Sequence, residues 1–200
     1  MEPYEIIGAP FTLWLAPEGT AFPAIDAVPD AGSWTTIGTS GDENYSEEGV
    51  TVSHDAAFQK VRPAGSIGAR KAFLDTEDLM IGLTLWDMSL EQYAIALNGA
   101  SVTTTAAGAG SAGFKKMGLS RGETVTTYAL LARGPSPYAA GMNAQFEVPR
   151  CYQSGSPKPV FNRARPAGLA LQFDALEDSA ATDPAERFGR LIAQHQAPLP

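Results

Sequence analysis

Cysteine and histidine are scarce in this chain, and their scarcity excludes several kinds of site. Cys151 is the only cysteine, so no disulfide can form within the chain. Its position at the end of a predicted strand favours a structural thiol over a nucleophile. His54 and His195 are the only histidines, which is too few for a metal site at sensible spacing or for a readily assembled Ser-His-Asp triad. We therefore expect no metal site and no enzymatic activity.

Charged residues are also few, and positive charge is in the minority. Only 18% of the residues are charged, against about 25% in an average domain, and this is low for the surface of a free monomer. The formal net charge is −8, which argues against a protein that grips nucleic acid, because that affinity comes from Lys and Arg at phosphates. This charge is compatible with an acidic surface that DNA passes without binding.

Long apolar runs are missing as well. No window reaches the ~18 apolar residues of a membrane span, and the N-terminus lacks the basic and apolar regions of a secretory signal. We expect a soluble protein made in a cytoplasm. The 44% of hydrophobic residues suffice for a core, and 20 Gly and 15 Pro separate short apolar runs, as in an all-β chain with many turns. Two hundred residues fit one domain.

Apolar alternation predicts seven to nine strands and no βαβ pattern. The strongest strand is 79–86, which is apolar on part of its second face and so is expected to be covered on both sides. Residues 142–148 predict a half-exposed strand with Asn143, Gln145 and Glu147 toward solvent. Residues 184–192 fit a helical turn or a last strand. Further strands are expected within 4–15, 33–38, 50–54, 114–119, 124–132, 160–161 and 169–175.

One helix is expected between Ser89 and Gly99. Ser89 is a predicted N-cap with Gln92 three residues later, and Asn98 and Gly99 predict a left-handed end. A helix of about ten residues is marginal alone, so it must lie against a sheet. The sequence thus predicts a mainly β fold: an antiparallel β-sandwich or barrel with one flanking α-helix and a long extended loop or arm.

Residues 100–113 form a low-complexity loop of small residues with no core of its own. The loop contains a G-x-G-x-x-G match from Gly108 to Gly113. Dinucleotide binding needs this motif between a strand and a helix, with an acidic residue about 20 positions later. The sequence that follows, from Phe114 to Gly122, does not make a helix, so we expect no cofactor.

Charges of both signs mark residues 42–75, where apolar periodicity lapses after 54. The acidic turn alone fits a solvated surface, and its spacing fails the calcium-loop pattern. A segment of this length is usually either functional or disordered. The functional interpretation is an arm whose basic residues pair with acidic residues of a neighbouring copy, since complementary charge sets register and partner choice. The candidate inter-subunit contacts are Asp42, Glu43, Glu47, Glu48, Lys60, Arg62, Arg70, Lys71 and Asp75.

The serial order of several segments resembles the major tail tube proteins of long-tailed (siphovirus-like) bacteriophages. The resemblance covers most of the chain except residues 100–113, and no single segment is diagnostic. The segments are APEGTAFP (16–23), SWTTIGT (33–39), EEGVTVSH (47–54), LTLWDMSLEQYAIALNG (83–99), FEVPRC (146–151), LALQFDALED (169–178) and ERFGRL (186–191).

The resemblance implies a structural virion protein of the phage tail. Six copies would form a ring, rings would stack into a tube, and strands from each copy would join into a continuous barrel around a lumen through which DNA is ejected without specific binding. Partners would be further copies and other tail proteins, namely the tape measure, the terminator and the distal tail protein. Residues 1–200 would be one tail tube domain with its arm at about 42–75 and a frayed tail at 194–200.

Other functions fit less of the sequence. A β-sandwich virion decoration or carbohydrate-recognition module would show a groove of exposed aromatic residues, whereas Trp14, Trp34 and Trp86 are all expected to be buried. An enzyme would need a nucleophile and base, which no pattern supplies. A tail terminator, or the tube of a contractile or secretion apparatus, could share the same fold.

Overall fold

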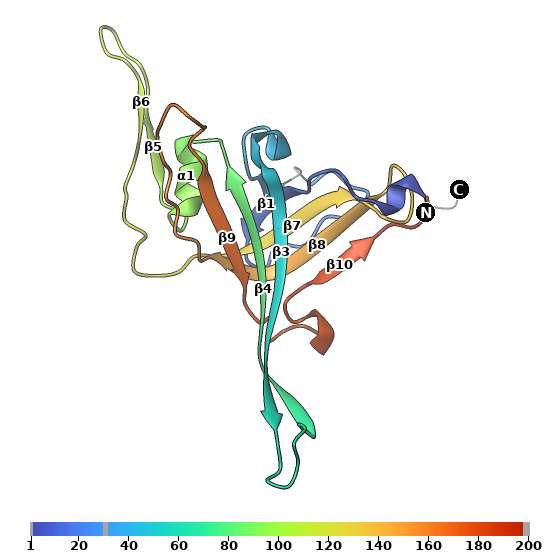
Figure 1. Ribbon diagram of the computed structural model, residues 1–200. Helices are drawn as coiled ribbons and strands as arrows, with labels where there is room; N and C mark the ends of the chain where they lie inside the picture. Colours follow the sequence, from blue (N-terminus) through green and yellow to red (C-terminus); the bar gives the residue numbers. More distant parts are fainter. Residues whose placement is uncertain (1, 30–31, 198–200) are drawn as a thin grey trace.

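The computed structural model describes residues 2–29 and 32–197 and is mainly β, with one antiparallel sheet of eight strands and one α-helix (Figure 1). The strand order is β2-β1-β7-β8-β9-β4-β3, and β10 pairs with β8. The strands are β1 (Thr12–Pro17), β2 (Thr35–Thr36), β3 (Tyr45–Val61), β4 (Lys71–Leu85), β7 (Thr127–Pro135), β8 (Asn143–Gln153), β9 (Leu169–Ala175) and β10 (Arg190–Ala193).

The remaining elements are short. A separate hairpin consists of β5 (Val102–Thr105) and β6 (Phe114–Met117). The helix α1 spans Leu90–Ala96, and three 3-10 turns are η1 (Pro3–Glu5), η2 (Gly41–Asn44) and η3 (Pro184–Glu186). Within the described part of the chain, no helix combines the length and the apolar character needed to cross a membrane.

Apolar side chains from both halves of the sheet meet in one main core. Alternate residues of β4 (Leu79, Ile81, Leu83 and Leu85) are buried there with Phe173 and Leu171 of β9, Leu13 of β1 and Leu130 of β7. This alternation is the period of two that the sequence showed, so the predicted strand at 79–86 is confirmed, with β4 ending at Leu85. A smaller cluster on the other face of β1 and β7 holds Trp14 and Trp34.

The two edges of the sheet are joined by a tyrosine rather than by strand pairing. The buried Tyr45 hydroxyl accepts a hydrogen bond from the Leu13 amide at 3.0 Å and donates one to the Ile37 carbonyl at 2.9 Å. Burial, more than any neighbouring charge, raises the pKa of Tyr45 well above its ordinary value, so the phenol stays protonated and can donate. Among the described residues, β2 and β3 do not pair, so the sheet stays open rather than closing into a barrel.

The predicted helix is confirmed, but its N-terminal bond differs from the prediction. Ser89 precedes the helix without capping it through its side chain. Instead, Asp87 Oδ1 accepts a hydrogen bond from the Ser89 amide at 2.9 Å. At the other end, Asn98 and Gly99 both have positive φ, and the Gly99 amide bonds to the Ala94 carbonyl at 2.9 Å, as expected for a left-handed end.

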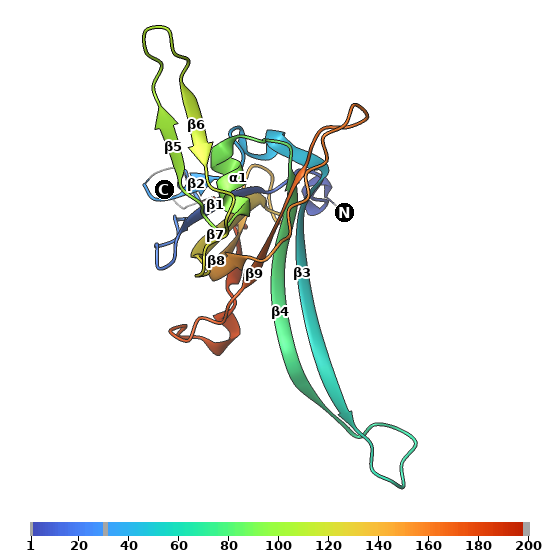
Figure 2. The same ribbon diagram turned by 90° about the vertical axis from the view of Figure 1, so that its left-hand side faces the viewer.

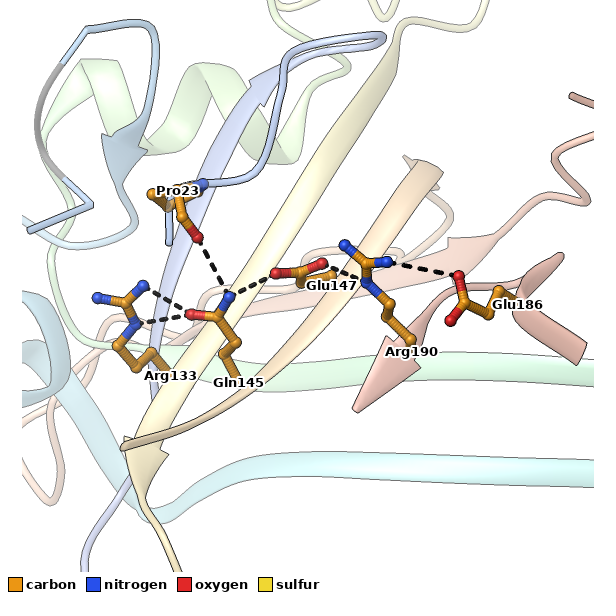
Figure 3. Close-up of polar contacts among 6 residues, drawn as sticks. All are labelled: Pro23, Arg133, Gln145, Glu147, Glu186 and Arg190. Carbon is orange, nitrogen blue, oxygen red and sulfur yellow. Dashed lines mark hydrogen bonds and ion pairs between the residues drawn. The ribbon is translucent and has the colours of Figure 1, made fainter. Parts of the chain in front are cut away.

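The prediction that β8 is half exposed is wrong. Gln145 and Glu147 are buried, because the loop at 18–29 covers the face that the sequence assigned to solvent. Strand β10 pairs alongside β8 and places Arg190 beside Glu147. A chain of polar contacts replaces solvent there (Figure 3). We call this chain the polar ladder; its members are Arg133, Gln145, Glu147, Arg190 and Glu186.

Hydrogen bonds and ion pairs connect the members of the polar ladder in order. Arg133 donates to Gln145 Oε1 from Nε at 3.0 Å, and the Gln145 amide donates to Glu147 Oε1. Arg190 Nε donates to Glu147 Oε2 at 2.7 Å, and Arg190 Nη1 lies 3.5 Å from Glu186 Oε2. The hydrogen bond to Glu147 is the main cause of the raised pKa of Arg190, whereas burial lowers the pKa of Arg133.

Three smaller predictions also need comment. Residues 160–161 form no strand, and 184–192 contain both alternatives, the turn η3 followed by β10. The low-complexity loop at 100–113 includes β5 and the turn that leads to β6. Of the predicted frayed tail at 194–200, residues 198–200 lie outside the described residues.

Candidate assembly interface

The hairpin of β3 and β4 extends far beyond the body of the protein (Figure 2). Strand β9 pairs with β4 from Met80 to Leu85, and beyond Met80 the strands β3 and β4 pair only with each other within the described part of the chain. From residue 53 to 78 every residue except Ser66 is exposed. The arm expected at about 42–75 therefore contains a continuous antiparallel ribbon that reaches the pair Val61 and Lys71, although apolar periodicity in the sequence lapses after residue 54.

The ribbon carries large apolar side chains that no part of the described chain covers. Phe58 is 60% exposed and Phe73 is 46% exposed, and Ile67 at the turn is fully exposed. A bulge between Ala57 and Phe58 shifts the register, and beyond it Phe58 stands opposite Leu74. An isolated two-stranded ribbon is marginally stable in water, so a partner that covers these side chains would stabilise it.

Charge on the hairpin is separated along its length. The end distal to the body carries four cations, which we call the basic tip: Lys60, Arg62, Arg70 and Lys71. The part nearer the body carries four anions, which we call the acidic stem: Asp55, Asp75, Glu77 and Asp78. Asp55 lies directly opposite Asp78, a like-charge arrangement that destabilises a ribbon.

None of these eight side chains forms an ion pair with a described residue. The one charge contact is that of the Lys71 ammonium, which lies 4.6 Å from the centre of the Phe73 ring. Charge of this kind is available to an outside partner without first breaking an internal bond.

A second charged region lies where β3 begins. We call it the acidic segment; its members are Asp42, Glu43, Glu47 and Glu48. Tyr45 pairs with Leu85 and Val50 with Leu83, so four residues of β3 oppose the single residue Thr84 and form a wide bulge. Gly49, with a φ of 64°, closes this bulge. The bulge presents Glu47 and Glu48 to solvent at an open sheet edge, whereas Asp42 accepts a hydrogen bond from Thr12 Oγ1 at 2.8 Å.

Beside the acidic segment lies a groove of about 410 Å³ that contains Trp86. The Trp86 amide donates to the Asn44 carbonyl at 2.8 Å, which fixes the residue next to η2. The expectation that all three tryptophans are buried is wrong for Trp86, which is 40% exposed because it lies just past the end of β4. Glu47 and Glu48 form one wall of this Trp86 groove, and Lys158 and Arg165 line it too.

The basic tip and the acidic segment lie at opposite ends of the molecule. The turn of the β3–β4 hairpin projects at the bottom of Figures 1 and 2, whereas the start of β3, the end of β4 and the loop before β9 lie near the top. The structure thus groups the predicted contact residues into two sets, with Asp75 in the acidic stem between them. The two sets cannot pair within one chain.

The β5–β6 hairpin projects from the same end as the acidic segment, opposite to the basic tip (Figures 1 and 2). Lys115 of β6 forms an ion pair with Glu91 of α1 at 2.5 Å, which ties this hairpin to the helix. The Gly108–Gly113 motif forms its turn, where Gly108 and Ser111 bridge. Because the turn joins two strands, it lacks the helix N-terminus that holds a pyrophosphate.

The remaining chemistry-bearing residues are dispersed. Within the described residues no group of three or more His, Cys, Asp and Glu side chains could hold a metal ion. Cys151 is buried in β8, and burial raises the pKa of its thiol to about 12, so the thiolate is scarce at neutral pH. His54 is exposed on β3 and His195 is exposed after β10.

No model of a known protein family matches the chain, and no curated protein matches it significantly. The sequence did not single out Trp86, Phe58 and Phe73 as contact residues. The signal that would have found the two aromatic residues of the hairpin is the presence of phenylalanine in a charged, otherwise polar segment.

Proposed function

We propose that this protein is a self-assembling structural subunit, namely the tail tube protein of a long-tailed bacteriophage. Copies would form rings, six to a ring by the resemblance, and the rings would stack into a tube that conducts DNA into the host. The protein would act in the virion tail, with the tape measure, terminator and distal tail proteins as partners and without an active site.

The observation that carries this proposal is the β3–β4 hairpin. Beyond Met80 it holds eight charged side chains that form no ion pair with a described residue and five exposed large apolar side chains that no described element covers. The apolar residues are Phe58, Val61, Ile67, Phe73 and Leu74. Exposed apolar surface on an extended element is typical of an interaction site.

Open strand edges give a physical route to a tube wall. Among residues 2–29 and 32–197, none pairs with the outer edge of β3 or with the outer side of β4 from Lys71 to Leu79. Hairpins that point the same way could pair β3 of one copy with β4 of the next by strand addition. A ring of such hairpins would make the continuous barrel that the resemblance implies, and a net charge of −8 favours a wall that does not retain DNA.

The test is negative-stain electron microscopy of the purified protein, together with a deletion of Gln59–Gly68. Wild-type protein should form stacked rings or tubes with a central channel. The deletion leaves five residues, 69–73, to join Phe58 with Leu74, a normal hairpin connection. We expect this variant to keep its fold by circular dichroism and to fail to polymerise.

Two results would contradict the proposal. One is wild-type protein that stays monomeric at high concentration, in several buffers and with tail partners present. The other is a deletion variant that forms normal tubes. Loss of the fold on deletion would instead show that the hairpin belongs to the core, and Arg62→Ala with Phe73→Ala in the full-length chain would then test assembly without shortening the ribbon.

The Trp86 groove favours one second candidate, a carbohydrate-recognition module. An exposed indole beside carboxylates can stack on a sugar ring and accept bonds from its hydroxyls. This candidate predicts that soluble oligosaccharides change the tryptophan fluorescence of the monomer and that Trp86→Ala abolishes the change without affecting assembly. The absence of any such change, alongside tube formation, would favour the structural subunit.

A further inference from the structure

We infer that the basic tip of one copy docks against the acidic segment and Trp86 of the next copy, so that successive copies are joined head to tail. This inference rests on the proposed function, because it names the contact through which rings would stack. Its occupant is a second copy of this chain.

Charge balance is the first argument. The basic tip has four cations and no anion between residues 60 and 71, and the acidic segment has four anions and no cation between residues 42 and 48. Glu43, Glu47 and Glu48 form no ion pair with a described residue, as is true of the four cations. Contact between the two sets would pair opposite charges that the monomer leaves unpaired, and it would fix which surfaces meet.

Side-chain chemistry is the second argument. Arg62 and Arg70 bring planar guanidinium groups, which bind carboxylates through two parallel bonds and stack on aromatic faces. The Trp86 groove offers both partners, the carboxylates of Glu47 and Glu48 and an exposed indole. A guanidinium over an indole is the most favourable cation–π arrangement among aromatic side chains. The fully exposed Ile67 gives the same tip an apolar contact.

Lys158 and Arg165 also line the groove and set the direction of approach. They belong to the loop before β9, whereas the acidic segment belongs to η2 and β3. Cations of the incoming tip would be repelled by the loop and attracted by the β3 bulge. The tip should therefore engage the β3 side, and the two loop cations are not needed for docking.

The third argument is geometric. Surfaces at opposite ends of one molecule make a heterologous contact, which forms an open array unless rotation closes it. The tip begins at Lys71 and the groove lies at the Leu85 end of the same strand, fourteen residue steps away. At about 3.3 Å per residue, the start of the tip is roughly 46 Å from the groove, which sets the scale of the translation between stacked copies.

The experiment exchanges the charges of the two surfaces. One variant carries Glu47→Lys and Glu48→Lys, and a second carries Arg62→Glu and Arg70→Glu. Each alone cancels the net charge of one surface and places like charges together at the exchanged positions, so each should raise the concentration needed for assembly at least about tenfold. An equimolar mixture should assemble, because the carboxylates introduced in the second variant face the ammonium groups introduced in the first, and the unchanged tip of the first faces the unchanged acidic segment of the second.

A matched control carries Lys158→Glu and Arg165→Glu, which changes the net charge as much as the tip variant does. We expect it to assemble at least as well as wild type, because it removes repulsion. Wild-type assembly should also weaken between 50 mM and 500 mM NaCl as screening increases. Circular dichroism of each monomer checks that the fold is kept.

The outcomes separate the inference from the proposed function. Wild-type protein that does not assemble overturns the proposed function itself. Wild-type tubes that tolerate both charge variants, or variants that stay apart when mixed, overturn the docking inference alone. If the Lys158 and Arg165 variant loses assembly while the Glu47 and Glu48 variant keeps it, the groove receives an acidic surface and the inference is wrong.

Discussion

The polar ladder and the β3–β4 hairpin are both rich in charged residues. Those of the ladder are held by ion pairs and hydrogen bonds, whereas those of the hairpin form no ion pair with a described residue. Glu147 is 3% exposed and is held by Gln145 and Arg190. The hairpin leaves Arg62 and Asp78 exposed and without an ion pair. A buried charge must be paired because desolvation is costly. An exposed charge needs no partner for folding, so its arrangement is free to serve contacts with other molecules.

Aromatic residues show the same contrast. In the body, Phe11 packs against Phe146 with ring centres 5.8 Å apart, and Phe22 packs against Trp34 at 5.3 Å. On the hairpin, Phe58 and Phe73 lie open to solvent. The comparison separates residues that stabilise the fold from residues available for assembly, and it can be tested by substitutions in pairs.

The largest expected effect comes from the polar ladder. Glu147→Ala should lower the free energy of unfolding by about 3 kcal/mol, because Arg190 and the Gln145 amide would lose their acceptor in a covered site. Urea unfolding of the dilute monomer measures this loss. The matched hairpin change, Asp78→Ala, should shift it by less than about 0.5 kcal/mol. Equal losses in the two variants would show that the hairpin is part of the cooperative core.

A smaller effect is expected at Asp87, which joins the segment after β2 to the start of α1. Asp87 accepts hydrogen bonds from Thr39 and from the Ser89 amide. Burial acts to raise its pKa, but these hydrogen bonds outweigh burial and hold the pKa below its ordinary value of 3.8. Asp87→Asn should therefore lower the free energy of unfolding by about 1 kcal/mol at neutral pH.

The sign of the pH dependence follows from the lowered pKa. The extra stability given by the Asp87 carboxylate is complete above the unfolded pKa, near 3.8, and is lost as the pH falls through the folded pKa. The difference between wild type and Asp87→Asn should accordingly shrink in acid. Asp75→Asn, at a hairpin carboxylate that accepts no bond from a described residue, provides the control. A difference that grows in acid would contradict the assignment.

The smallest effect on folding is expected for the exposed aromatic residues of the hairpin. Phe58→Ser with Phe73→Ser should change the free energy of unfolding by less than about 0.5 kcal/mol, because neither side chain is buried in the monomer. The same variant should reduce assembly, which light scattering can follow. Phe173→Ser, in the buried core, is the contrasting change and should destabilise strongly. A marked loss of monomer stability in the hairpin variant would remove the distinction between the two regions.

Local patterns in the sequence determined much of the fold. Alternation at Leu79, Ile81, Leu83 and Leu85 identified strand β4, because a buried strand face repeats every two residues. Asn98 and Gly99 identified the end of α1, because few other residues adopt positive φ at low cost. The antiparallel, mainly β class followed from such short-range signals.

Only the tertiary structure decided which polar faces are covered and which apolar residues are left open. The local alternation places Gln145 and Glu147 on a solvent face, but the loop at 18–29 covers this face and β10 pairs beside it, and both segments are distant in sequence. The sequence pattern predicts that Trp86 is part of the core, but β4 ends one residue before it, at Leu85. The pairing of 55–61 with 71–78 is not visible in the sequence, because an exposed ribbon needs no apolar alternation. Burial depends on packing between residues that are distant in sequence, whereas the apolar periodicity of a segment reflects only the arrangement of neighbouring residues.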